Sequence, residues 1–145
     1  MKSMRPMSST SDGKGLIPRG LHVHLDCVGY IPPATDDHSW ILELMREAVR
    51  NSNAREVHAH VVPFDGSVSP PGFAAVVLID ESHVTAHCYS DRGLLAIDAF
   101  TCGMTEPEVI IDQLLQSITK EIPTLQVVNR NRTTRFLHDH SIESL

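Results

Sequence analysis

Residues 73–100 read FAAVVLIDESHVTAHCYSDRGLLAIDAF, and this stretch decides the fold. Residues 73–79 form an unbroken apolar, β-branched run, which is typical of a central strand buried on both faces. Segments 84–89 and 94–100 indicate two more strands, and residues 90–93, Ser-Asp-Arg-Gly, supply the turn between them. We therefore expect a sheet built around these three strands.

Both flanks of this stretch add strands and helices. Alternating apolar and polar residues predict strands that begin at Gly20 and at Glu56, and a last strand is expected over 124–128. Apolar residues recur at helical spacing over 41–49 and 109–118, with cap signals at Asp36 or Asp37 and at residues 105–108. The resulting order, β-α-β-β-β-β-α-β, predicts an α+β fold. We expect a two-layer sandwich, with two helices on one face of a mostly antiparallel sheet.

Length and composition fit one small domain. The 145 residues divide into a loose tail (1–19), a domain (20–130) and a polar C-terminal segment (131–145). A net charge of −6 argues against a nucleic-acid partner, and no apolar stretch is long enough to span a membrane. Three cysteines and no signal peptide favour a cytoplasmic protein with reduced thiols.

The chemically informative segment is 80–87, Asp-Glu-Ser-His-Val-Thr-Ala-His. A serine hydrolase is one candidate, but the Gly-x-Ser-x-Gly elbow is absent and no strand-to-helix turn follows Ser82. From spacing alone, the simplest interpretation is that Ser82 ends a hairpin and the histidines face solvent.

A longer pattern changes that interpretation. Residues 81–103 read ESHVTAHCYSDRGLLAIDAFTCG, and they resemble the signature of the short prokaryotic S-adenosylmethionine decarboxylases. The resemblance extends over about residues 20–120, through the Pro-Pro-Gly of 70–72 and the Gly-Leu-His of 20–22. It implies a pyruvoyl-dependent decarboxylase that cleaves itself between Glu81 and Ser82.

The resemblance also implies a role for each residue. Ser82 attacks the carbonyl of Glu81 and becomes the pyruvoyl cofactor, which then acts as the electron sink. His87 assists processing as a base, and Cys102 donates a proton to the carbanion left by decarboxylation. Short members of the family usually pair, so a homodimer of cleaved protomers with composite active sites is expected.

Several positions depart from the family pattern. After His87 the family has Thr-Trp-Pro-Glu, whereas this chain has Cys-Tyr89-Ser-Asp91. The glutamate is expected to bind the ribose of S-adenosylmethionine, and Asp91 is shorter by about 1.5 Å. A serine that commonly supports processing is replaced by Ala74. Either another hydroxyl substitutes for it, with Thr85 as a candidate, or processing is slower.

These departures favour changed specificity with retained chemistry. We expect a small, amino-acid-like cationic substrate, either L-arginine or L-ornithine, whose charge would pair with Asp91. The alternative is S-adenosylmethionine itself, with Phe64, Phe73 or Tyr89 stacking on adenine or attracting the sulfonium. Both choices lead to polyamines.

Three His-x-His pairs could suggest a metal-binding module: His22/His24, His58/His60 and His138/His140. None has an accompanying ligand set with recognisable spacing, so we expect polar sheet-face histidines and no metal. A non-catalytic relative that regulates an active partner is the other alternative, and it would show no self-cleavage.

Overall fold

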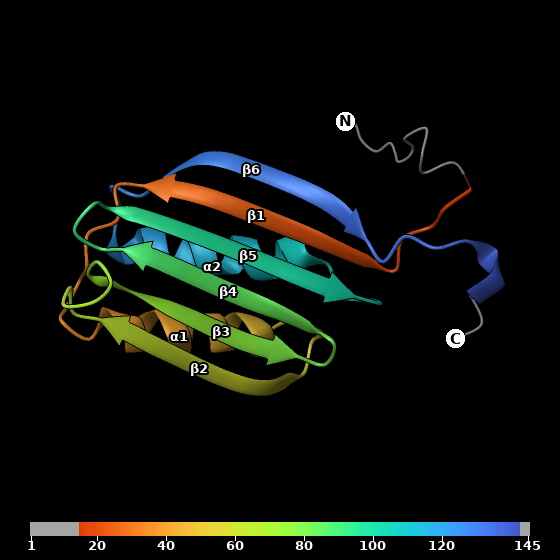
Figure 1. The fold of residues 1–145 in the computed structure, drawn as a ribbon, viewed down its shortest axis with the longest axis horizontal. Helices are drawn as coiled ribbons and strands as arrows, with labels where there is room; N and C mark the ends of the chain where they lie inside the picture. Colours follow the sequence, from red (N-terminus) through yellow and green to blue (C-terminus); the bar gives the residue numbers. More distant parts are fainter. Residues whose placement is uncertain (1–14, 143–145) are drawn as a thin grey trace.

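The computed structural model describes residues 15–142 and forms one six-stranded antiparallel sheet (Figure 1). The order across the sheet is β2-β3-β4-β5-β1-β6, so the three strands of the 73–100 stretch are consecutive neighbours. The strands are β1 (Gly20–Val28), β2 (Glu56–Phe64), β3 (Gly72–Ile79), β4 (Ser82–Tyr89), β5 (Leu94–Cys102) and β6 (Gln126–Arg135).

Two helices, α1 (Asp37–Arg50) and α2 (Pro107–Glu121), cover the same face of the sheet (Figure 1). Side chains alternate along each strand, so every second residue faces the helices and forms the core. Core residues include Val77 on β3, Val84 on β4, Met45 on α1 and Leu114 on α2. The expected α+β sandwich is confirmed.

The link between β3 and β4 is a two-residue turn, because Ile79 pairs directly with Ser82. Asp80 and Glu81 occupy this turn. Asp80 has a φ of 48°, a left-handed conformation that residues other than glycine adopt rarely and at an energetic cost. The peptide bond between Glu81 and Ser82 therefore joins a strained turn to the first residue of a central strand.

The last strand differs from the one expected over residues 124–128. β6 begins at Gln126 and continues to Arg135, pairing with β1 along its whole length. Nearly all of its residues are exposed, because β6 is an edge strand, so no apolar alternation marks it in the sequence. Backbone pairing to β1 defines this strand.

Most of the expected N-terminal tail, residues 1–14, lies outside the described residues, as do residues 143–145 at the other end. Ile17 forms an isolated antiparallel bridge with His138, with hydrogen bonds in both directions. A short 3-10 helix, His140–Ile142, follows. Both terminal segments lie beyond the end of the sheet where β4 starts and β5 ends (Figure 1).

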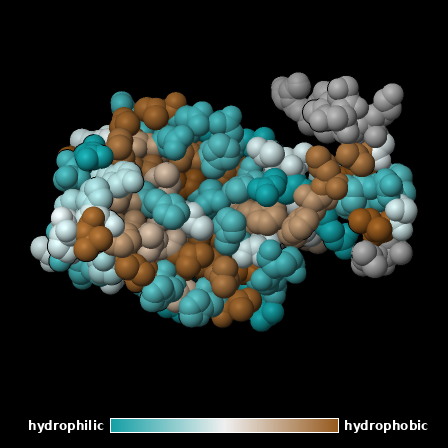
Figure 2. Space-filling view, in the orientation of Figure 1, coloured by the Kyte–Doolittle hydropathy of each residue, from teal (hydrophilic) through white to brown (hydrophobic). Residues whose placement is uncertain are grey.

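The face of the sheet opposite the helices carries no covering layer among the described residues. Apolar side chains lie between polar ones over this open face (Figure 2). Large exposed apolar residues on it include Val62, Phe64, Leu78, Tyr89 and Leu94. Within residues 15–142, neither helix is long and apolar enough to span a membrane.

Candidate active site

Ser82 and Cys102 lie side by side at one end of the sheet. Ser82 begins β4, Cys102 ends the neighbouring β5, and the Ser82 hydroxyl donates a hydrogen bond to the Cys102 sulfur over 3.2 Å. Ser82 is 5% exposed. The structure thus brings together two residues that lie twenty positions apart in the sequence and that the resemblance assigns to one site.

Two cavities flank this pair. One of about 50 Å³ is bordered by Glu81, Ser82 and Cys102. The other, about 700 Å³, is open to solvent and is bordered by Glu81 and Cys102 and by the terminal segments, including Arg19 and Phe136. A small molecule entering the larger cavity would reach the thiol and the Glu81 end of the scissile bond.

His87 lies at the opposite end of β4. It pairs with Ala74 on β3 and Ala96 on β5, and its side chain is exposed on the open face. It lies five positions along the extended strand from Ser82, a span of about 16 Å at 3.3 Å per residue. Within one chain, the expected base is therefore too far from Ser82 to exchange a proton with it.

His87 borders a pocket of about 470 Å³ on the open face, together with Tyr89, Phe64 and Asp26. Ala96 forms part of its lining, where its small side chain leaves room. This pocket collects two of the three predicted aromatic substrate contacts on exposed positions. The pocket lies about one strand length away from Ser82.

Phe73, the third predicted aromatic contact, borders the same pocket but is only 2% exposed. Its position on β3 faces the helices, and its ring meets Tyr30 edge to face at 6.3 Å. Because the ring is part of the core, it has no free face for stacking on a ligand. Asp91 lies exposed in the β4–β5 turn and borders neither this pocket nor the cavity at Cys102.

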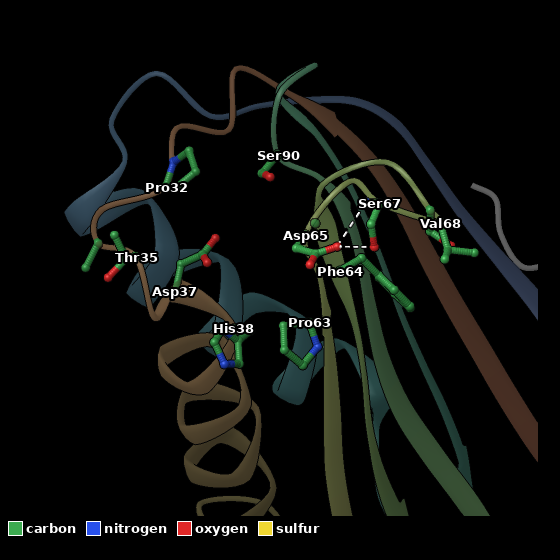
Figure 3. A pocket seen from close by; sticks show the side chains of 13 residues that line it. Pro32, Thr35, Asp37, His38, Pro63, Phe64, Asp65, Ser67, Val68 and Ser90 are labelled. Atoms are coloured by element: carbon green, nitrogen blue, oxygen red, sulfur yellow. Dashed lines mark hydrogen bonds between the residues drawn. The ribbon is translucent and has the colours of Figure 1, made fainter.

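A further pocket of about 640 Å³ lies between the start of α1 and the loop that follows β2 (Figure 3). Asp65 in that loop accepts hydrogen bonds from the backbone and hydroxyl of Ser67. Asp37, from the first turn of α1, accepts a hydrogen bond from Tyr30 at 2.6 Å. Of the predicted site residues, this pocket contains Phe64 alone.

Sequence analysis missed a hydrogen-bonded cluster centred on Asp98 of β5. The Asp98 carboxylate contacts His22 Nε2 at 2.5 Å, His83 Nε2 at 2.9 Å and the Thr85 hydroxyl. Burial alone would raise the pKa of Asp98, but the bonds from His83, Thr85 and His22 outweigh it and lower the pKa to about 2. The alternation of β5 was the available signal, since it places Asp98, Phe100 and Cys102 on one face.

The Thr85 hydroxyl is part of the same hydrogen-bonded cluster. It bonds to Asp98, whereas the strand register places Ala74 next to His87. Thr85 is therefore not positioned to replace the serine that the family commonly has at the Ala74 position. Thr85 is the only hydroxyl that the sequence pattern suggested as a substitute for this serine.

The two cysteines without an assigned task lie in the core. Burial, followed by the nearby Asp26 carboxylate, raises the pKa of Cys27 to about 11. Burial, with Asp37 and Asp91 adding to it, raises the pKa of Cys88 to about 12. Both thiols stay protonated at neutral pH. Cys102 differs from them in its position, since it is partly exposed and in contact with Ser82.

Among the described residues, His22, His83 and Asp98 place three potential metal-ligand atoms within 4.8 Å of one another. The expected pairs do not build this group: His22 belongs to one of them, while its partner His24 does not join. His58 and His60 stack on each other at 6.3 Å on the edge strand β2. The grouping His22–His83–Asp98 comes from three strands and is visible only in the fold.

These features define an α+β protein with a serine–thiol pair at a hairpin end and a pocket bordered by a histidine towards the far end of the same strand. The sequence profile of the S-adenosylmethionine decarboxylase family matches residues 21–131. The chain belongs to this family, whose members are pyruvoyl-dependent carboxy-lyases made as self-cleaving proenzymes.

Individual relatives agree with this assignment. The chain is 28% identical over 112 residues to an S-adenosylmethionine decarboxylase proenzyme of Pyrococcus abyssi, covering 77% of this chain and 78% of the relative. It is 33% identical over 103 residues to the proenzyme of Brevibacillus brevis, covering 70% and 74%. The crystal structure of the adenosylmethionine decarboxylase from Aquifex aeolicus has the same fold. It aligns with a TM-score of 0.56 at 24% identity, over 84% of this chain and 90% of that one.

Proposed function

We propose that this protein cleaves itself at Glu81–Ser82 and then decarboxylates S-adenosylmethionine. The observation that carries the proposal is the contact between the Ser82 hydroxyl and the Cys102 thiol at the end of a strained turn. The residues fit a pyruvoyl group formed in place, because Ser82 is buried beside a candidate proton donor and follows a two-residue hairpin.

Self-cleavage begins when Ser82 Oγ attacks the Glu81 carbonyl carbon. A C–O bond forms, the C–N bond breaks, and the proton passes to the freed nitrogen, which gives an ester. Removal of the Ser82 α-proton then breaks the Cβ–O bond and releases Glu81 as a carboxylate. Tautomerisation and attack by water leave a ketone and release ammonia. The cavity bordered by Glu81, Ser82 and Cys102 has room for that water.

The pyruvoyl ketone supplies the electron sink that pyridoxal phosphate supplies in other decarboxylases. Cys102 then holds a proton at Sγ, next to the former Ser82 position, and returns it to the substrate carbon after carbon dioxide leaves. The cavity of about 700 Å³ beside Cys102 offers space for the rest of the substrate.

The choice of substrate rests on two observations. The expectation of L-arginine or L-ornithine as substrate depends on Asp91 as the partner of the cation. Asp91 borders neither the pocket at His87 nor the cavity at Cys102. The matched family and the similar relatives carry the name S-adenosylmethionine decarboxylase. Phe64 and Tyr89 remain exposed on the open-face pocket, where aromatic rings can stack on adenine or attract a sulfonium.

We further propose a homodimer in which two chains complete each other's site. Ser82 and His87 lie at opposite ends of one strand, and a symmetric dimer repeats the same contact twice. If two open faces pack with their strands running in opposite directions, the His87 end of one chain meets the Ser82 end of its partner. The exposed apolar residues of the open face support this packing.

The substrate test measures carbon dioxide release from purified protein given S-adenosylmethionine, L-arginine and L-ornithine in parallel. Release from S-adenosylmethionine alone is the expected result. Release from arginine or ornithine alone would replace the proposed substrate by a basic amino acid. A persistent band near 16.0 kDa, with no cleavage and no release, would favour a non-catalytic relative.

The dimer test combines two inactive chains. A Ser82→Ala chain cannot be cleaved but supplies His87, whereas a His87→Ala chain keeps its own Ser82. Co-expression with different tags is expected to restore cleavage of the His87→Ala chain in mixed dimers. Failure of restoration, with both chains folded and associated, would contradict a composite site.

We place the protein in the cytoplasm. Its three cysteines are free, and two of them are buried where oxidation would disrupt the core. Free thiols persist in reducing compartments, so this pattern supports an intracellular location. Localisation of a tagged chain by cell fractionation tests it.

A further inference from the structure

The Asp98 cluster links three adjacent strands on the open face. Asp98 lies on β5, His83 and Thr85 lie on β4, and His22 lies on β1. The Asp98 side chain is only 16% exposed and anionic, since its pKa is about 2. A carboxylate that accepts three hydrogen bonds in a sheet fixes the side chains that donate them.

The protonation pattern favours a hydrogen-bond hub over a metal site. Arg135 contacts His22 Nδ1 at 2.8 Å, and a guanidinium can only donate. Nδ1 therefore accepts, and Nε2 carries the ring proton that it donates to Asp98. A metal would require the lone pair of Nε2 and a proton on Nδ1, which would then face the Arg135 donor.

The hub lies next to the bond that is cleaved, because His83 directly follows Ser82. The His83 ring is held by Asp98 and also meets Phe100 edge to face at 5.6 Å. On the other side of the scissile bond, Asp80 is bonded to Arg55 at 2.5 Å. The segment 80–83 is thus anchored by side chains on both flanks, and the inner anchor at His83 is the more buried one.

We propose that Asp98, with His22 behind it, is a positioning residue for the Ser82–His83 peptide. Through His83, it sets the direction of the Ser82 hydroxyl towards the Glu81 carbonyl before cleavage. It keeps the same backbone unit aligned with Cys102 after cleavage. This inference rests on the proposed function, and it assigns Asp98 no contact with substrate.

The test uses the full chain with Asp98→Asn, which keeps the shape of the side chain but removes its charge and one acceptor. The control is Asp112→Asn on α2, which removes an exposed carboxylate that is ion-paired with Arg130 and lies outside the site. Self-cleavage is followed on a denaturing gel, and turnover of S-adenosylmethionine is measured on the cleaved fraction.

We expect cleavage and kcat of Asp98→Asn to fall about ten-fold to a hundred-fold, the effect of losing hydrogen bonds to a charged group. KM should stay within about two-fold, because the aromatic pocket is untouched, whereas loss of uniform binding would raise KM.

A second pair of variants keeps the inference testable if Asp98→Asn does not fold. His22→Gln retains an N–H donor near the position of Nε2, and His22→Ala removes it. We expect the glutamine variant to cleave close to the wild-type rate and the alanine variant to be slower. Equal rates for both, at equal melting temperatures, would contradict a positioning role.

Three further results would overturn the inference. One is an Asp98→Asn chain that melts earlier but cleaves and turns over like wild type, since Asp98 would then be structural only. Another is stoichiometric zinc in wild-type protein that disappears in His22→Ala, which would make the cluster a metal site. A wild-type chain that neither cleaves nor releases carbon dioxide would contradict the proposed function itself. Cleavage and carbon dioxide release are therefore measured on the wild type before any variant.

Discussion

The two ends of β4 differ in how firmly they are held. At the Ser82 end, the serine is buried, bonded to Cys102, and followed by a histidine fixed by Asp98. At the Tyr89 end, His87 and Tyr89 are exposed, and Tyr89 is 47% accessible. The first end keeps the residues of the family pattern, and the second keeps His87 but carries the departures at Tyr89, Ser90 and Asp91.

In the proposed function, the Ser82 end makes and breaks bonds, whereas the Tyr89 end recognises the substrate and supplies His87 to the partner chain. Self-cleavage requires atoms held in one geometry, which burial and hydrogen bonds provide. The exposed end has no such constraint within one chain, so side chains there can change without disturbing the core. The comparison predicts large effects for changes at the Ser82 end and, apart from His87, graded effects at the Tyr89 end.

The largest effect is expected from Ser82→Ala. Without the hydroxyl no ester can form, so cleavage and decarboxylation should both be abolished. A denaturing gel should show one band at 16.0 kDa in place of fragments of about 9 and 7 kDa, in proportion to the 81 and 64 residues on each side. Ser117→Ala on α2 is the matched control. Activity that survives in the Ser82 variant would remove the pyruvoyl mechanism.

Cys102→Ala should separate catalysis from processing. Loss of a positioned proton donor lowers turnover by about 10²–10⁴-fold, while cleavage remains possible because Ser82 is intact. Carbon dioxide release by the cleaved fraction measures this effect, with Cys27→Ala as the control for loss of a thiol. Normal turnover in Cys102→Ala would mean that another group delivers the proton.

The Asp98 cluster at the Ser82 end of β4 should add a pH-dependent contribution to the free energy of unfolding. The folded pKa of about 2 lies below the unfolded value of 3.8, so the contribution is present above pH 4 and is lost as the pH falls from 4 towards 2. The shift corresponds to about 2 kcal/mol. Urea unfolding should therefore show wild type more stable than Asp98→Asn by about this amount at pH 7. The gap should shrink at pH 2.5, and a constant gap would contradict the linkage.

Ala74→Ser tests the exposed end of β4 and should speed up self-cleavage. The register places this residue beside His87, so a hydroxyl there can hydrogen-bond to groups at the partner's scissile bond in the proposed dimer. One hydrogen bond is worth about 1 kcal/mol, so cleavage should speed up by about five-fold. The time course of cleavage measures it, and Ala96→Ser on the other side of His87 is the control. A slower cleavage rate would show that the added hydroxyl disturbs the packing.

The smallest effect is expected from Asp91→Glu. Asp91 is exposed and borders no substrate pocket in the single chain, so KM for S-adenosylmethionine should change by about two-fold or less. A ten-fold fall in KM would show that the turn moves and that residue 91 contacts the ribose. Steady-state kinetics, with Asp65→Glu as control, distinguishes a small change in KM from a ten-fold fall.

The residue pattern gave the strands, the helices and their order because burial alternates with fixed periods in a sheet and in a helix. The motif from Glu81 to Gly103 named Ser82, His87 and Cys102. Periodicity failed for β6, which is exposed on both faces and has no apolar alternation. The choice of Phe73 as a substrate contact rested on its aromatic ring alone and was wrong, because its position on β3 turns the ring into the core.

The sequence by itself determined the α+β class and the family, and it supplied the proposal for the residues of self-cleavage, since these depend on local order along the chain. The tertiary structure alone decided which of them meet. It joined Ser82 to Cys102 across two strands, separated Ser82 from His87 by a strand length, and gathered His22, His83 and Asp98 into one hub. Strand pairing sets these distances, and pairing between residues far apart in sequence cannot be read from their local pattern.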